Sequence, residues 1–160
     1  MFRLHVMLKI FLKLMSSRLN NINWSSKANS YGLLRILNKQ KIGTKIVHIN
    51  AQSLCNKMDE FRYIFEDSYT DIICISETWF SPEILDSVFT LNGYQLFRND
   101  RETHAGGVAF YAKSYISCRI LSKSVQIGKT EFIFIEIVAH NDKMLIGCVY
   151  RKHKTVDYSN

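Results

Sequence analysis

An unbroken apolar run, Ile72-Ile73-Cys74-Ile75, constrains the fold of this sequence more than any other segment. A short run that is apolar on successive residues is typical of a strand covered on both faces. Residues 44–50 form a second short, β-branched segment, and between the two segments apolar residues recur at helical spacing: Leu54, Met58, Phe61, Phe65 and Tyr69. The sequence therefore predicts a strand at 44–50, an amphipathic helix and a strand at 71–77.

The rest of the chain is predicted to form one short helix followed by strands. Ser81-Pro82-Glu83 combines a capping serine, a proline at the first helical position and an acid in the first turn, so a helix is expected from there to about Val88. Turns at Asn92-Gly93, Gly128-Lys129 and Asn141-Asp142 separate the strands that follow. The five predicted strands are 94–97, 106–113, 115–121, 132–137 and 144–150. Together with the first segments, this pattern indicates the α+β class.

The basic charge is concentrated in the first 43 residues. The formal net charge is +7, but residues 1–43 hold eight Lys and Arg residues and no acid, whereas residues 44–160 hold 13 basic and 14 acidic residues. Within the first segment an apolar stripe at helical spacing is interrupted by basic residues; the stripe is Leu4, Met7, Leu8, Phe11 and Met15. We expect residues 1–43 to be a basic leader, either disordered or an amphipathic helix, and residues 44–160 to be the folded domain. The composition of the leader is also compatible with a mitochondrial transit peptide.

Composition and spacing argue against several other classes of protein. No stretch approaches the roughly 18 consecutive apolar residues of a membrane-spanning helix, so no transmembrane segment is predicted. Gly128-Lys129-Thr130 resembles the end of a phosphate-binding loop, but position 123, where the first glycine would stand, is a lysine. The cysteines form no Cys-x-x-Cys pair and are predicted to be thiols in a reducing compartment, the nucleus or the cytoplasm; they are Cys55, Cys74, Cys118 and Cys148.

Polar residues stand at the ends of three predicted strands. If the strands at 44–50 and 71–77 are adjacent and parallel, the crossover brings their carboxyl ends, Asn50 and Glu77, to one edge of the sheet. Carboxylate oxygens with water and phosphate oxygens are the ligands that Mg²⁺ prefers. Tyr150 also ends a strand, and a phenol there is a hydrogen-bond donor for a phosphate oxygen. The structural alternative is that each of the three residues merely ends a strand.

A series of short motifs in this order resembles the endonuclease/exonuclease/phosphatase superfamily. More narrowly, the motifs resemble the apurinic-endonuclease-like domain of non-LTR retrotransposons of the jockey and CR1 kind. The resemblance covers about residues 44 to 151, and its motifs are Ile49-Asn50-Ala51-Gln52-Ser53-Leu54-Cys55-Asn56-Lys57, Asp71-Ile72-Ile73-Cys74-Ile75-Ser76-Glu77-Thr78-Trp79, Leu91-Asn92-Gly93-Tyr94, Arg98-Asn99-Asp100-Arg101, Gly106-Gly107-Val108-Ala109 and Val149-Tyr150-Arg151.

This resemblance implies a DNase I-like four-layer αββα sandwich and a Mg²⁺-dependent endonuclease that nicks target DNA for retrotransposition. By matching position, Asn50 would belong to the active-site hydrogen-bond network, Glu77 would bind one or two Mg²⁺ ions, and Tyr150 would contact the scissile phosphate. Three further residues lie in a polar segment that would face DNA, the expected partner: Arg98, Arg101 and His104.

The second half of the family pattern is not found in this sequence. The resemblance calls for a Gly-Asp-Phe-Asn motif with the catalytic Asp and Asn, and for a Ser-Asp-His motif with the Asp–His pair; the 160 residues contain neither. We therefore expect an incomplete sandwich, the N-terminal half of the domain, which is inactive by itself and leaves an apolar sheet face uncovered. The missing half-domain or a reverse transcriptase domain is a further expected partner.

Two other functions are weighed against this one. The chain would be a non-catalytic fragment if its basic leader binds nucleic acid through phosphates, with an affinity that falls steeply with salt. It would be a phosphatase of the same superfamily if its substrate is a phosphoinositide or a nucleotide. The likeness of residues 92–108 to the retroelement branch argues mildly against the phosphatase.

Overall fold

The computed structural model describes residues 43–101, 105–125, 130–139 and 142–151. The leader up to residue 42, His104, the predicted turn at Gly128-Lys129 and Asn141 lie outside the described residues. The described part of the chain confirms a mixed α+β fold that is mostly sheet.

The first sheet has four strands in the order β1-β2-β4-β3, and the strands are β1 (Ile46–Asn50), β2 (Ile72–Ser76), β3 (Tyr94–Asn99) and β4 (Val108–Lys113). Strands β1 and β2 are parallel, while β4 is antiparallel to both β2 and β3. A 3-10 turn, η1 (Cys55–Lys57), and the helix α3 (Met58–Phe65) connect the parallel pair. The first two strands are therefore parallel. This pairing is the condition under which Asn50 and Glu77 were expected at one edge of the sheet.

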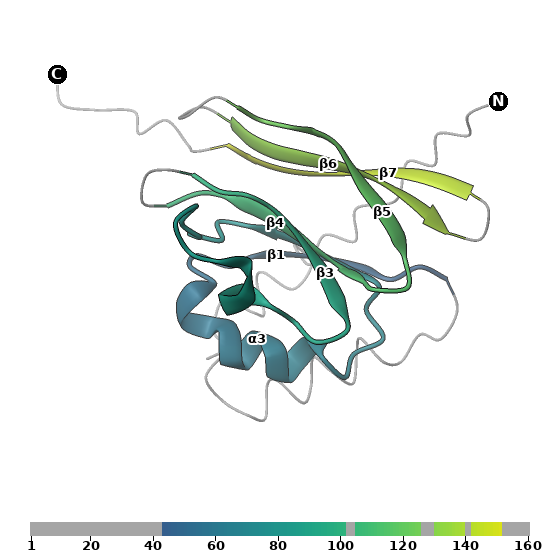
Figure 1. Ribbon diagram of the computed structural model, residues 1–160, viewed down its shortest axis with the longest axis horizontal. Coiled ribbons are helices and arrows are strands. Elements are labelled where there is room, and N and C mark those ends of the chain that lie inside the picture. Colours follow the sequence, from purple (N-terminus) through teal and green to yellow (C-terminus); the bar gives the residue numbers. More distant parts are fainter. Residues whose placement is uncertain (1–42, 102–104, 126–129, 140–141, 152–160) are drawn as a thin grey trace, which may run out of the picture.

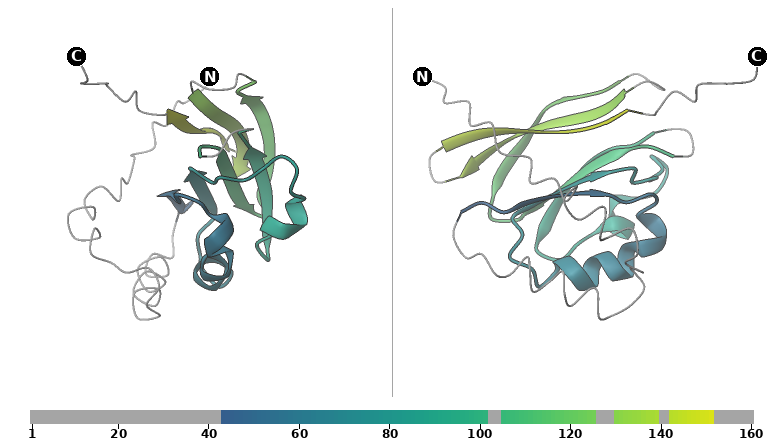
Figure 2. Two further views of the ribbon diagram at one scale, coloured as in Figure 1. Left: turned by 90° about the vertical axis from the view of Figure 1, so that its left-hand side faces the viewer. Right: turned by 180° about the vertical axis from the view of Figure 1, so that it is seen from behind.

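The second sheet has three antiparallel strands, β5 (Ser117–Lys123), β6 (Thr130–Ala139) and β7 (Asp142–Arg151), in the order β5-β6-β7. Figure 1 shows this sheet above the four-stranded sheet and α3 below it. The views in Figure 2 show the same succession of helix, sheet and sheet. The described residues thus form three layers, with two sheets that do not close on each other.

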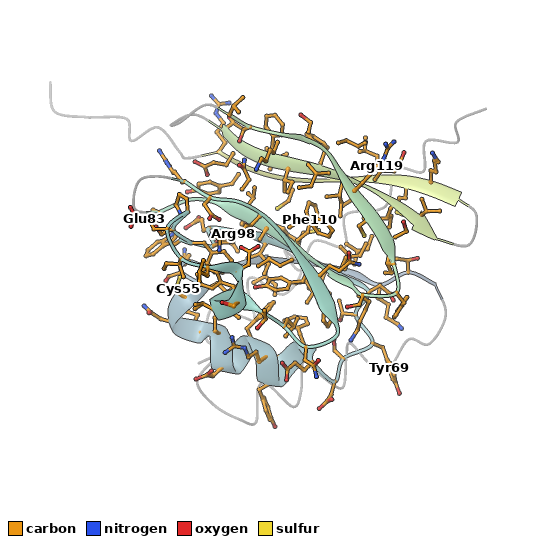
Figure 3. All side chains as sticks on the ribbon, in the orientation of Figure 1. Cys55, Tyr69, Glu83, Arg98, Phe110 and Arg119 are labelled. Carbon is orange, nitrogen blue, oxygen red and sulfur yellow. The ribbon has the colours of Figure 1, made fainter. Side chains whose placement is uncertain are left out.

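Two apolar cores lie on the two faces of the first sheet. Ile73 and Ile75 of β2 pack toward α3, whereas Ile72 and Cys74 pack toward the second sheet. Figure 3 shows Phe110 of β4 between the two sheets, in the second of these cores. Because β2 is fully buried on both faces, every one of its positions is apolar or small.

Two local predictions were wrong. Ser81 begins a turn, in which the amide of Ile84 donates to its carbonyl at 3.0 Å, and the helical segment is the 3-10 turn η2 (Asp86–Phe89). The Arg98 guanidinium donates hydrogen bonds to the carbonyl oxygens of Ser81 at 3.1 Å and Ile84 at 2.7 Å. These oxygens would otherwise be available as acceptors in a continuing helix. Tyr69 is 58% exposed rather than part of the apolar helix face, because α3 ends at Phe65.

All four cysteines are free thiols, as predicted, and Cys74 and Cys148 are buried. Within the part of the chain that the structure describes, no helix has the length and apolar content needed to cross a bilayer.

Candidate functional site

Asn50 and Glu77 meet at the carboxyl edge of the parallel pair. Asn50 is opposite Ser76 in the β1–β2 register, so Glu77 follows directly after the paired residues. The Asn50 Nδ2 donates to Glu77 Oε1 at 2.9 Å. Asn50 is exposed and Glu77 is partly exposed, so the carboxylate is open to an incoming ion.

The loops that carry these two side chains have an unusual backbone. Gln52, Ser53 and Glu77 have φ values of +44°, +75° and +56°, in a region that non-glycine residues seldom adopt. The amide of Ser53 donates to the Glu77 carbonyl at 3.0 Å, and Lys57 Nζ donates to the Ala51 carbonyl at 2.6 Å. The Ser53 hydrogen bond joins the loop after β1 to the loop after β2, and the Lys57 contact ties the loop after β1 to η1.

Tyr150, near the end of β7, reaches the same place from the second sheet. Its phenol lies close enough to the Glu77 carboxylate to respond to its negative charge. Partial burial raises the pKa of Tyr150, and the negative charges of Glu77 and Glu131 raise it further. A tyrosine hydroxyl is neutral near pH 7 at its ordinary pKa, so the phenol keeps its proton for donation.

The donor set fits Mg²⁺ through one protein carboxylate. Magnesium usually takes one or two carboxylates and completes its octahedron with water and phosphate oxygens. Glu77 supplies that carboxylate, with the Asn50 amide and the Tyr150 hydroxyl beside it. Over the described ranges, no group of three or more His, Cys, Asp or Glu side chains is arranged to hold a metal. Water and phosphate oxygens would fill the remaining positions.

Glu131 is a fourth polar residue here, and the sequence analysis missed it. It lies opposite Tyr150 in the β6–β7 register and is 5% exposed. Its Oε1 is 3.3 Å from Nη1 of Arg101. The signal was present in the alternation of β6, because Glu131 has the same parity as Ile133 and Ile135, which face the core between the sheets. A charge at such a position needs a specific partner.

Two of the residues predicted to face DNA, Arg98 and Arg101, pair with carboxylates of the protein itself. Arg98 is turned inward: it pairs with Asp100 at 2.9 Å and with Asp86 at 3.2 Å, and its side chain is only 12% exposed. Figure 3 shows it beside the 81–89 segment. Arg101 does approach the site, through Glu131, with 11% of its side chain exposed. The described contacts of both arginines are internal, their contact with DNA stays a prediction, and His104 lies outside the described residues.

No protein-family model matches the chain, and a search of curated proteins finds no match either.

Proposed function

We propose that the chain carries half of the active site of a Mg²⁺-dependent DNA endonuclease of the endonuclease/exonuclease/phosphatase type, close to its retroelement branch. The observation that carries this proposal is the meeting of an amide, a carboxylate and a phenol from β1, the β2 end and β7. The helix and two sheets would then be the N-terminal part of a four-layer αββα sandwich.

Each of the three side chains has a distinct task in this proposal. Asn50 donates to one oxygen of Glu77 and so fixes the direction in which the carboxylate faces a metal ion. Tyr150, held neutral, donates a hydrogen bond to a phosphate oxygen as negative charge develops there. When bound, Mg²⁺ supplies a Lewis acid that polarises the phosphoryl oxygen and stabilises the leaving oxygen.

The same reasoning makes the chain inactive by itself. Hydrolysis needs a base that orients or deprotonates the attacking water. In this proposal Glu77 binds the metal and Glu131 is paired with Arg101, so neither of these two site carboxylates is placed for that task. Catalytic groups act as a unit, and the loss of several typically costs orders of magnitude in rate.

Manganese binding tests the metal half of the proposal. Mn²⁺, a paramagnetic substitute for Mg²⁺, is titrated into the wild-type chain, Glu77→Gln and Glu83→Gln, with free Mn²⁺ measured by electron paramagnetic resonance. Glu83 is an exposed carboxylate outside the site. We expect one site in the wild type and in E83Q, and an affinity at least about tenfold lower in E77Q. Equal affinity in all three proteins would contradict the proposal.

A nicking assay tests the catalytic half. Supercoiled plasmid with Mg²⁺ should remain intact with this chain and should be nicked by a version extended through the missing Asp and His motifs. If the extended protein instead hydrolyses a phosphoinositide or a nucleotide and leaves the plasmid intact, the phosphatase replaces the endonuclease.

A further inference from the structure

Glu131 uses both carboxylate oxygens inside the protein, between the two sheets. Oε1 pairs with Nη1 of Arg101 at 3.3 Å, and Oε2 accepts a hydrogen bond from the amide of Gly107 at 3.2 Å. The Arg101 guanidinium also donates to the carbonyl of Ala105 at 3.4 Å. Glu131 and its arginine thus hold both ends of the segment that leads into β4.

The Gly106-Gly107 pair fits closely between Glu131 and the loop after β2. Both glycines have positive φ, +107° and +82°. A Cβ on Gly106 would lie 2.8 Å from Glu131 Oε2, and a Cβ on Gly107 would lie 2.5 Å from Thr78 Oγ1. Only glycine allows the backbone to approach both side chains this closely.

The same two glycines hold the loop that carries Glu77. The carbonyl of Gly107 accepts from the amide of Thr78 at 3.3 Å, and the carbonyl of Gly106 accepts from the amide of Trp79 at 2.9 Å. These are the two residues directly after Glu77. A continuous path of hydrogen bonds therefore runs from Glu131, through the glycine pair, to the two residues that directly follow the candidate metal ligand.

Stability alone does not explain an acid at position 131. Its neighbours of equal parity, Ile133, Ile135 and Ile137, are fully buried isoleucines, so an apolar side chain is what the core favours there. Burying a carboxylate costs several kcal/mol of desolvation even when it is paired. The geometry points to Glu131 as a positioning residue: it fixes the Gly106-Gly107 pair, and through it the Glu77 carboxylate, for metal binding. The link to metal binding rests on the function proposed above.

The experiment compares Glu131→Ala and Glu131→Gln with Glu136→Gln in the intact chain. Glu136 is a matched control, since it lies on the same strand and its carboxylate pairs with Arg119 at 2.9 Å, away from the site. The first readout, without metal, is the side-chain amide resonance of Asn50 in nuclear magnetic resonance spectra, with Glu77→Ala as the reference for a lost Asn50–Glu77 contact. The second readout is Mn²⁺ affinity.

We expect E131A to move the Asn50 resonance to its E77A position, and E131Q to move it part of the way, because glutamine keeps an acceptor for Gly107 but loses the ion pair. Loss of an outer-shell partner lowers metal affinity by roughly 10–100-fold. E136Q should leave both readouts at wild-type values. If E131A does not fold, E131Q alone carries the test.

The two proposals fail in different ways. An Asn50 resonance that stays at its wild-type position in folded E131A or E131Q overturns the positioning role, whatever the melting temperature does. Absence of Mn²⁺ binding in the wild type, with the resonance shifted in E131A, overturns the metal site and leaves Glu131 as the residue that positions the Glu77 loop.

Discussion

At the scale of single residues, backbone strain is concentrated around the candidate site. Five non-glycine residues among those described have positive φ: Gln52, Ser53, Glu77, Trp79 and Ala105. Gln52 and Ser53 follow β1, Glu77 and Trp79 follow β2, and Ala105 precedes the Gly106-Gly107 pair that is hydrogen-bonded to the loop after β2. Such conformations cost of the order of 1–3 kcal/mol each and persist where surrounding contacts enforce them, which is common at functional sites.

The glycine next to this site gives a prediction about stability. Gly107→Ala should lower the free energy of unfolding by about 1–2 kcal/mol for its positive φ and by about 1–3 kcal/mol more for the contact with Thr78. Gly93→Ala is the control, since Gly93 has a φ of +77° and a Cβ there would meet no atom within 4 Å. Urea denaturation measures the free energy of unfolding of both variants. Equal losses of unfolding free energy in the two variants would show that the close contact with Thr78 adds no destabilisation.

The polar residues at the strand ends could be identified from the sequence. The tertiary contacts that hold these strand ends in position could not. Asn50, Glu77 and Tyr150 were predictable because each stands at the end of a strand with a clear pattern. The role of Glu131 depends on a contact with Gly107, 24 residues away in the chain, which no local pattern encodes. The inward turn of Arg98 was missed for the same reason, because its partners on the 81–86 segment are tertiary contacts.

At the scale of elements, β7 contacts β2 through the buried thiol of Cys148, and Cys74 of β2 lies in the same core. Cys148 Sγ donates to the carbonyl of Ile75 on β2 at 3.3 Å. Burial raises the pKa of Cys148 to about 12 and raises that of Cys74 well above its usual value.

The strands themselves were predictable from the alternation of apolar and polar residues and from the apolar run at 72–75. The 3-10 turn η2 was not predictable, because its start is set by Arg98.

Thiol reactivity follows from this packing. Iodoacetamide at pH 8 should modify the partly exposed Cys55 and Cys118 first, and should reach Cys74 and Cys148 only after unfolding, because a buried thiol forms little thiolate. Peptide mass spectrometry over a time course measures the order. Modification of Cys148 at the rate of Cys118 in the folded protein would mean that the two sheets are not packed as described.

At the scale of the whole molecule, the second sheet keeps apolar side chains in contact with solvent. Val138, Leu145 and Val149 are 40%, 55% and 53% exposed. We therefore expect the chain to self-associate, and Leu145→Lys to reduce that association without a loss of folding. Sedimentation velocity over a range of concentrations measures it. A monodisperse wild-type monomer that melts cooperatively would contradict this expectation.

Alkaline pH should destabilise the fold through the half-buried Tyr94. Burial raises the pKa of Tyr94 from 10.0 to about 12, and its hydroxyl donates to the Thr70 carbonyl at 2.7 Å. A pKa raised by folding favours the neutral phenol in the native state, so this contribution is complete below about pH 10 and is lost as the pH rises toward 12. Urea denaturation across that interval should show falling stability, with a shallower fall in Tyr94→Phe. An identical pH dependence in wild type and Y94F would exclude Tyr94 as a source.

We propose that Asn50, Glu77 and Tyr150 form one metal and phosphate site. Crystals soaked in Mn²⁺ and measured at the manganese absorption edge would show the ion itself. We expect an anomalous difference peak within coordination distance of the Glu77 carboxylate, and we expect no such peak in Glu77→Gln crystals. Manganese bound only at other carboxylates, with none beside Glu77, would contradict it.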